Sequence, residues 1–327
     1  MSPATRVCRS LDELRDRLPG LVLTVGNFDG VHLGHRRILE TVIAAARARR
    51  GTAAALTFEP HPARILHPER APQRLTTPEQ KLALLEAAGL DLVVVLPFNL
   101  ELSQLTPRQF VEEMLHRRLA TQQLCVGENF RFGHKQAGDV ALLKELAAAL
   151  GVAVEVIAPV VVRGQTVSSS LVRKLIASGG VDKAARFLGR PFALTGKVEP
   201  GAGRARALGF PTLNTQPEQE CLPARGVYVT EVALGARLFS AATNVGVRPT
   251  FDGQSLTVES HLLDFEETVA AGRLEVRLLE HLREEKKFDS PEALRAQIAR
   301  DLDRARRYFA QRAQSDAQKQ KKLEAAG

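Results

Sequence analysis

The sequence contains no tryptophan and two tyrosines, and aromatic residues make up 5% of the chain. Proteins that stack nucleic-acid bases carry aromatic side chains interleaved with basic ones, and no such run occurs here, so we expect no nucleic-acid partner. No apolar stretch approaches the roughly 18 residues that cross a bilayer, and the first residues lack the apolar core of a signal peptide. The pattern therefore predicts a cytoplasmic protein without a membrane partner.

Cysteine is also scarce, and the common phosphate-binding P-loop motif is absent from the sequence. The three cysteines, Cys8, Cys125 and Cys221, are far apart and odd in number, which suits a reducing cytosol. The Gly-rich P-loop pattern G-x-x-x-x-G-K-[ST] does not occur. The net charge is +8 and the isoelectric point is near 9.7. Because much of the arginine is scattered along helical stretches, this charge favours solvated faces and polyphosphate ligands over nucleic acid.

The first 180 residues alternate between short apolar runs and longer helical patterns, which indicates a Rossmann-like parallel sheet covered on both faces. The predicted strands are 21–25, 52–58, 91–98, 123–127 and 152–162. The predicted helices are 35–50, 78–88, 107–119, 138–150 and 170–178. A chain of 327 residues with 44% hydrophobic residues is long enough for two domains, and residues 1–180 form the first.

The second domain, 181–310, starts with a short helix at 181–188 and then changes to a β pattern. Runs separated by Gly or Pro turns predict a small antiparallel barrel. These runs are 192–198, 226–234, 237–244, 255–264 and 273–280. A closing helix is predicted over 290–309, capped by Asp289 or Ser290 with Pro291 first, and 311–327 is predicted to be a disordered tail.

The first candidate site is a glycine-rich loop between the strand 21–25 and the helix that follows it. Gly26–His35 contains His32 and His35, which share a face on the first helical turn. A strand, a turn and a helix start direct backbone N–H groups at an anion, and two imidazoles can stabilise a phosphate that gains charge during reaction. The loop therefore predicts a nucleotidyl-transfer site. Zinc is disfavoured because no third ligand lies nearby at a usual spacing.

Two further segments carry candidate nucleotide ligands. Asn129, after the fourth predicted strand, can bind a base or ribose edge, or can belong to an ordinary polar loop. Ser169 and Ser170 start a helix with Arg173 one turn later. Their hydroxyls can cap that helix or, with the arginine, hold a triphosphate.

The second half carries a glycine-rich segment that includes Gly203 and Gly209 and ends in Thr212 and Asn214. Glycine lets backbone approach phosphate closely, and two oxygen side chains two residues apart on an extended segment suit Mg²⁺. An ordinary turn is the alternative. Glu259 lies in an alternating strand pattern, where it can accept a proton from an attacking hydroxyl or be a plain exposed carboxylate.

Seven sequence motifs resemble those of the bacterial bifunctional riboflavin kinase/FAD synthetase family over about residues 15 to 310. In chain order they are G-x-F-D-G-x-H-x-G-H, G-E-N-F-R-F-G, S-S-[ST]-x-[IV]-R, G-F-P-T-x-N, T-N-V-G-x-R-P-T-F, V-E-x-H-L-L-D-F and L-R-x-E-x-x-F. Ser170 stands where the family often has Thr, and Asn129 stands where some members have Asp.

The resemblance implies phosphorylation of riboflavin to FMN by the barrel domain, followed by adenylylation of FMN to FAD by the first domain. It implies ATP as co-substrate, Mg²⁺ in both domains and no tightly bound prosthetic group. The catalytic residues it implies are His32, His35 and Glu259, with Thr212 and Asn214 at the metal. The ATP-binding residues it implies are Gly26, Phe28, Asn129, Ser169, Ser170, Arg173, Gly203, Gly209, Thr212 and Asn214. The closing motif suggests Arg283 and Phe288 as flavin contacts.

Three alternatives remain at this stage. The chain can be another adenylyl- or cytidylyltransferase whose barrel only binds the acceptor, a flavin-binding or regulatory module whose catalytic loops have decayed, or a nucleic-acid binder. Riboflavin, FMN and ATP are the expected small-molecule partners, and a monomer or weak homo-oligomer is expected.

Overall fold

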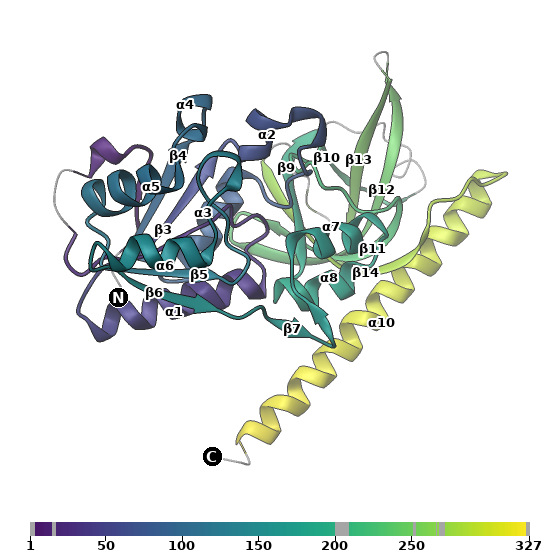
Figure 1. The fold of residues 1–327 in the computed structure, drawn as a ribbon. Helices are drawn as coiled ribbons and strands as arrows, with labels where there is room; N and C mark the ends of the chain where they lie inside the picture. Colours follow the sequence, from purple (N-terminus) through teal and green to yellow (C-terminus); the bar gives the residue numbers. More distant parts are fainter. Residues whose placement is uncertain are drawn as a thin grey trace. The chain divides into compact units, whose positions relative to one another are not determined.

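The computed structural model of the chain describes residues 4–14, 18–199, 209–250, 253–265, 267 and 272–324. The chain divides into two compact units, Met1–Ser169 and Ser170–Gly327 (Figure 1). The sequence places the boundary at residue 180 instead, because Ser178, Gly179 and Gly180 interrupt the helical pattern there. In the structure the helix after these glycines, α8 (Val181–Leu188), packs on the barrel strands of the second unit.

The first unit is built on a six-stranded sheet in which every pairing is parallel. In spatial order the strands are β1 (Arg6–Cys8), β4 (Leu92–Pro97), β3 (Ala53–Glu59), β2 (Val22–Val25), β5 (Gln123–Gly127) and β6 (Ala153–Ile157). A small hairpin pairs β7 (Val161–Val162) with β8 (Gln165–Thr166). The predicted strand 152–162 is therefore not continuous: β6 ends at Ile157, and Val161–Val162 is a strand of the separate hairpin.

Helices cover both faces of this sheet (Figure 1). Alternate β2 residues enter two separate clusters: Val22 packs with α1 (Leu33–Ala48) and α3 (Pro78–Ala87), while Leu23 packs with η3 (Phe110–Arg118, a π-helix) and α6 (Val140–Ala148). Burial on both faces explains why the strands read as continuous apolar runs. The shorter helical segments are α2 (Pro62–Leu66), α4 (Leu100–Ser103), α5 (Pro107–Gln109), η1 (Leu11–Glu13), η2 (Pro68–Arg70) and η4 (His134–Gln136).

The strand order reverses direction between β2 and β5. From β2 the chain adds β3 and then β4 on one side, and it returns to add β5 and β6 on the other. In open parallel sheets, ligands bind beyond the carboxyl ends of the strands at such a reversal. The loops after Val25 and after Gly127 lie at this point, and they are the loops that contain His32, His35 and Asn129.

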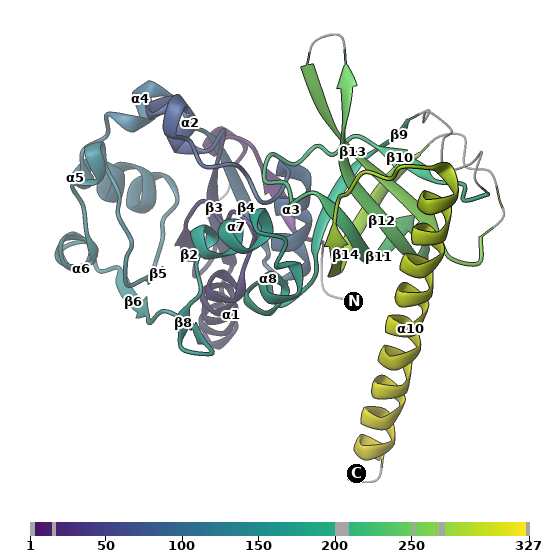
Figure 2. The ribbon, with the colours of Figure 1, turned by 90° about the vertical axis from the view of Figure 1, so that its right-hand side faces the viewer.

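The second unit is a closed antiparallel barrel preceded by α7 (Ser169–Ala177) and α8 (Figure 2). Around the barrel the strands are β10 (Leu213–Thr215), β13 (Gly253–Leu262), β12 (Arg237–Thr250), β11 (Gly226–Leu234), β14 (Arg273–Glu284) and β9 (Phe192–Glu199). The architecture confirms the predicted parallel sheet, barrel and closing helix. The sequence did not predict β1 or β10, each of three residues.

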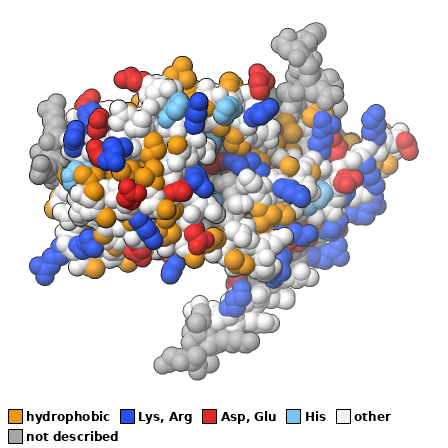
Figure 3. All heavy atoms as spheres, in the orientation of Figure 1, with side chains coloured by type: hydrophobic (Ala, Val, Ile, Leu, Met, Phe, Trp, Pro, Cys, Tyr) orange, Lys and Arg blue, Asp and Glu red, His pale blue; other side chains and the backbone are white. Residues whose placement is uncertain are grey.

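Helix α10 (Pro291–Glu324) packs against β11 and β12. Leu302 and Ala305 of α10 enter a cluster with Val227, Val229 and Ala242. Lys and Arg side chains gather along the outer side of this helix (Figure 3). Among the described residues, no helix combines the length and the apolar content needed to cross a membrane.

The disordered tail predicted from residue 311 is wrong as far as Glu324, because α10 continues to that residue. The physical reason lies in the composition. Residues 311–324 contain no Gly, Pro or β-branched residue, and Ala, Gln, Lys and Glu all have good helix propensity. Asp316 and Lys319, three residues apart, add an exposed ion pair at 3.6 Å.

Candidate active sites

The segment Gly26–His35, called the histidine loop below, continues into the first turn of α1, which begins at Leu33. His32 is the N-cap residue of α1, and its Nδ1 accepts a hydrogen bond from the His35 backbone N–H at 3.3 Å. A neutral His32 ring that accepts at Nδ1 carries its proton on Nε2. The two imidazole rings stack in parallel, with centroids 3.7 Å apart and planes 12° apart. The structure therefore brings both predicted histidines together at a helix N-terminus, where anions bind favourably.

Close packing fixes the rings of this loop. Phe28 is 1% exposed and meets the His35 ring edge-on, with centroids 5.3 Å apart. A Cβ at Gly34 would lie 3.1 Å from Cε1 of His32, and a Cβ at Gly26 would lie 3.2 Å from the Phe28 ring. Phe28 and Val31 adopt positive φ angles of 50° and 36°, which side chains rarely occupy. Such backbone conformations persist where the surrounding contacts enforce them.

Asp29 serves as the anchor of the loop. Its carboxylate is buried and accepts hydrogen bonds from the backbone N–H groups of Leu75 and Thr76 at 3.0 and 3.3 Å and from the Thr76 hydroxyl at 3.3 Å. The backbone N–H of Gly30 donates to the same hydroxyl at 3.3 Å. These contacts tie the loop to the segment that leads into α3, so we assign Asp29 a structural role.

The other predicted residues of the nucleotidyl-transfer site are distributed over both units. The Ser169 hydroxyl donates to the Asp29 carbonyl at 3.0 Å, so Ser169 contacts the histidine loop. Asn129 lines a hollow of about 210 Å³ with Glu128 and Arg131, close to the end of β5. Ser170 and Arg173 lie in α7 within the second unit, so their participation in this site stays a prediction.

The barrel carries a larger cavity of about 380 Å³, called the barrel cavity below. It contains every predicted residue of the second site except the two glycines: Thr212, Asn214, Glu259, Arg283 and Phe288. Gly209 lies just before these residues, with φ at +91°. Gly203 lies outside the described residues.

Strand register explains how distant polar residues meet in this cavity. Glu259 on β13 is directly opposite Asn214 on β10 and directly opposite Asn244 on β12. Neighbouring strands lie about 4.8 Å apart, so these three side chains form one polar row across three strands. On the opposite strand faces, the side chains of Thr230, Thr243 and Ser260 are fully buried. The Thr243 hydroxyl lies 2.6 Å from the Thr230 hydroxyl and 2.9 Å from the Ser260 hydroxyl, within hydrogen-bonding distance of both.

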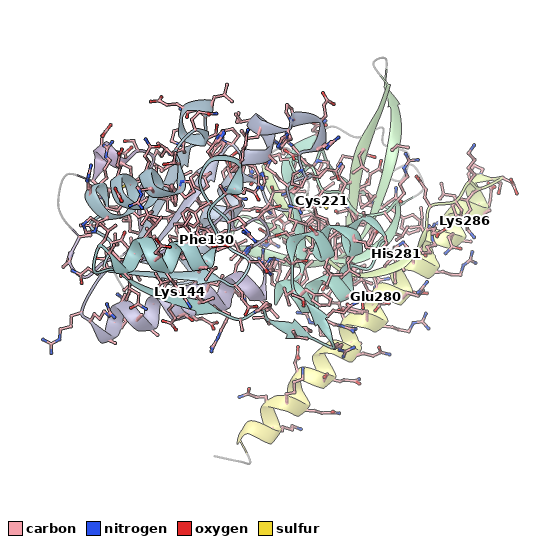
Figure 4. All side chains as sticks on the ribbon, in the orientation of Figure 1. Phe130, Lys144, Cys221, Glu280, His281 and Lys286 are labelled. Carbon is pink, nitrogen blue, oxygen red and sulfur yellow. The ribbon has the colours of Figure 1, made fainter. Side chains whose placement is uncertain are left out.

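Helix α10 and the segment after β14 form another wall of the barrel cavity. Arg283 donates from Nε and Nη2 to the Asp301 carboxylate at 2.9 and 2.8 Å, and Gln297 Nε2 donates to the same group at 2.9 Å. The Arg283 guanidinium and the Lys286 ammonium lie 5.8 and 5.3 Å from the centre of the Phe288 ring. Figure 4 shows Lys286 close to the start of α10. Arg283 is thus charge-paired, and any flavin contact would use its remaining N–H groups.

The donor chemistry of the barrel cavity fits a hard cation. Thr212, Asn214 and Glu259 all offer side-chain oxygen, the ligand that Mg²⁺ prefers together with water and phosphate oxygens. Within the described ranges, no group of three or more His, Cys, Asp or Glu residues could hold a metal ion. A cation here would therefore rely on the phosphates of a bound nucleotide for part of its ligation.

The sequence interpretation missed two residues that line the barrel cavity and one buried lysine in the first unit. Asn244 belongs to the T-N-V-G motif, and its pairing with Glu259 required the strand register. Asp301 lies on the helix that closes the cavity. Lys81 lies in α3 and is 7% exposed, and its ammonium group reaches the end of β3. Burial lowers its pKa, and the Glu59 carboxylate opposes that shift. A lysine within a helix gives no sequence signal of burial.

Two family models match the chain in succession. The FAD synthetase model matches residues 14–171, and the riboflavin kinase model matches residues 188–309. The bifunctional riboflavin kinase/FMN adenylyltransferase of Pseudomonas fluorescens is 39% identical over 92% of this chain and 97% of its own length. The protein of the same description from Escherichia coli K12 is 36% identical over 89% of this chain and 93% of its own length.

A solved structure also matches. The crystal structure of a macrolide-efflux protein from Streptococcus pneumoniae superposes with a TM-score of 0.85 and 26% identity, covering 93% of this chain and 99% of that one. The similarity therefore extends over both units of the fold.

Proposed function

The chain belongs to the family of bifunctional riboflavin kinases/FMN adenylyltransferases, and from that membership we propose how its residues divide the two reactions. The enzyme phosphorylates riboflavin to FMN with ATP and adenylylates FMN to FAD with a second ATP. The observation that carries the proposal is the barrel cavity, which gathers five separately predicted residues of one site. We assign adenylyl transfer to the predicted domain 1–180 and the kinase to 181–310.

In the kinase step Glu259 acts as general base. The ribityl 5′-hydroxyl oxygen of riboflavin attacks the γ-phosphorus of ATP, its proton passes to the Glu259 carboxylate, and ADP leaves. Asn214 and Asn244 flank Glu259 in the polar row. Phe288 offers an aromatic face to the flavin ring, and Arg283 supplies hydrogen bonds to it.

Mg²⁺ is the proposed cation of the kinase site. Thr212 and Asn214 hold it, and when bound it neutralises charge on the phosphates during transfer. The flanking segment with Gly203 and Gly209 binds ATP in this proposal. The oxygen-rich lining of the cavity supports the assignment.

In the adenylyl step the histidine loop binds the reacting phosphates. A phosphate oxygen of FMN attacks the α-phosphorus of ATP, the bond from that phosphorus to the bridging oxygen breaks, and pyrophosphate leaves. His32 and His35 donate hydrogen bonds to the oxygens that gain charge, and positioning supplies most of the remaining acceleration. Gly26, Phe28, Asn129, Ser169, Ser170 and Arg173 complete the ATP site.

The setting of the enzyme follows from these substrates. ATP, riboflavin and FMN are its proposed small-molecule partners, and we propose a cytoplasmic monomer or weak homo-oligomer without nucleic-acid or membrane partners. All three cysteines are buried free thiols, which supports a reducing compartment.

A chromatographic time course tests the function directly. Purified protein with riboflavin, ATP and Mg²⁺ is expected to form FMN first and FAD afterwards, with pyrophosphate released in proportion to FAD. Omitting Mg²⁺ and adding a chelator is expected to stop both steps. A protein that binds riboflavin but forms neither product would contradict the proposal.

A further inference from the structure

Lys81 lies in α3, and its side chain is 9% exposed. The ammonium group reaches the carboxyl end of β3. It donates to the Phe58 carbonyl at 3.1 Å and lies 3.5 Å from both the Thr57 hydroxyl and the Glu59 carboxylate. Three consecutive β3 residues therefore share one buried cation next to the histidine loop.

The number of hydrogen-bond donors on the Lys81 ammonium group determines whether it can also bind a phosphate. A lysine ammonium has three N–H donors, and three acceptors surround this one. No donor is left over for a phosphate. Arg74 also bonds Glu59, at 3.1 Å, which fixes the carboxylate that faces the lysine. The arrangement suits a lysine that fixes the protein structure rather than one that binds substrate.

Thr57 connects Lys81 to the histidine loop. Its side chain is fully buried, and its hydroxyl donates to the Asn27 carbonyl at 3.3 Å while lying within reach of Lys81. Asn27 is the second residue of the loop that contains His32 and His35. A chain of contacts thus runs from Lys81 through Thr57 to the backbone of the loop.

We propose that Lys81 is a positioning residue for adenylyl transfer, which acts through Thr57 on the histidine loop. The proposal rests on the function proposed for that loop. Burying an ammonium group costs free energy, and methionine would fill a similar volume without that cost. A lysine at this position is therefore explained by its directed hydrogen bonds, which hold the end of β3 and the loop in one geometry.

The test compares Lys81→Met, Thr57→Val and the double variant in the full chain. We expect Lys81→Met to lower kcat for FMN adenylylation by about 10- to 100-fold with KM for ATP and FMN nearly unchanged, since small misplacements of catalytic groups cost rates of this order. Because both residues lie on one path, kcat of the double variant should stay within about twofold of kcat of the slower single variant.

Two measurements separate positioning from loss of folded protein. Thermal melting shows that each variant is folded at the assay temperature, and riboflavin phosphorylation, which takes place in the other unit, should stay at the wild-type rate. Lys144→Met on α6 is the matched control, because Lys144 is exposed (Figure 4). It should leave both activities unchanged.

The outcomes are distinct. A folded Lys81→Met variant with wild-type kcat, or single-variant losses that multiply in the double variant, would overturn the positioning role. If the wild-type chain itself fails to convert FMN to FAD, the proposed function fails instead.

Discussion

At the scale of single residues, Gly34 determines whether the His32 ring fits in the histidine loop. Gly34 leaves room for the His32 ring directly against the first turn of α1, where a Cβ would approach Nδ1 to 3.2 Å. The ring can therefore cap the helix and still stack on His35. The sequence spacing predicts that both rings share a face, but it cannot predict that one of them is the cap.

Replacing either histidine by alanine should separate the two activities. We expect His32→Ala or His35→Ala to lower FMN adenylylation by about 10²- to 10³-fold, the scale for removing one preorganised donor, while riboflavin phosphorylation persists. Steady-state assays of each half-reaction measure this. Equal loss of both activities in a folded variant would contradict separate sites.

Glu259→Gln should have the complementary effect. The amide keeps the shape of the side chain but cannot accept the proton of the ribityl hydroxyl, so FMN formation should fall by about 10²- to 10⁴-fold. Conversion of added FMN to FAD should continue at the wild-type rate. FMN production at an undiminished rate would remove Glu259 as the base.

At the scale of elements, the sequence pattern predicts the long elements well and the short ones poorly. The strand at 21–25 and the helix at 78–88 differ from β2 and α3 by one residue at an end, because apolar periodicity and capping residues specify them locally. Strand β10 has three residues, which are too few to show a strand pattern in the sequence. Its strand structure comes from pairing with Glu199 of β9 and Glu259 of β13. Cavities depend on such pairings, so Asn244 could not be assigned from sequence.

Helix α10 gives a prediction at this scale, because Asp301 joins it to the end of β14. Asp301 is 3% exposed, and loss of one partner of a buried ion pair leaves the other charge uncompensated. Asp301→Asn should raise KM for riboflavin by about tenfold and lower the melting temperature of the barrel, with FMN adenylylation unchanged. These values come from steady-state kinetics and calorimetry.

Asp303→Asn is the matched control on the same helix. Its side chain is 71% exposed, and its contact with Arg306 is at 4.0 Å, so it should leave KM and stability unchanged. If Asp301→Asn behaves like this control, α10 does not depend on the ion pair for its position.

At the scale of the whole molecule, each unit has its own core, and the histidine loop and the barrel cavity lie in different units. Two single-site variants should then complement each other in solution. A mixture of His32→Ala and Glu259→Gln proteins with riboflavin, ATP and Mg²⁺ should make FAD, because FMN released by one protein can be used by the other. Each variant alone should be slow, and a mixture no faster than either would show that FMN must stay on the chain that made it.

The placement of α10 also orders events during synthesis. Leu294, Ile298, Asp301 and Leu302 complete a wall of the barrel cavity, so a ribosome-bound chain lacks that wall until α10 has been translated. The histidine loop and its sheet, in contrast, precede the barrel in the chain and can fold while the barrel is still being made. A nascent polypeptide should therefore gain the second step of its pathway before the first.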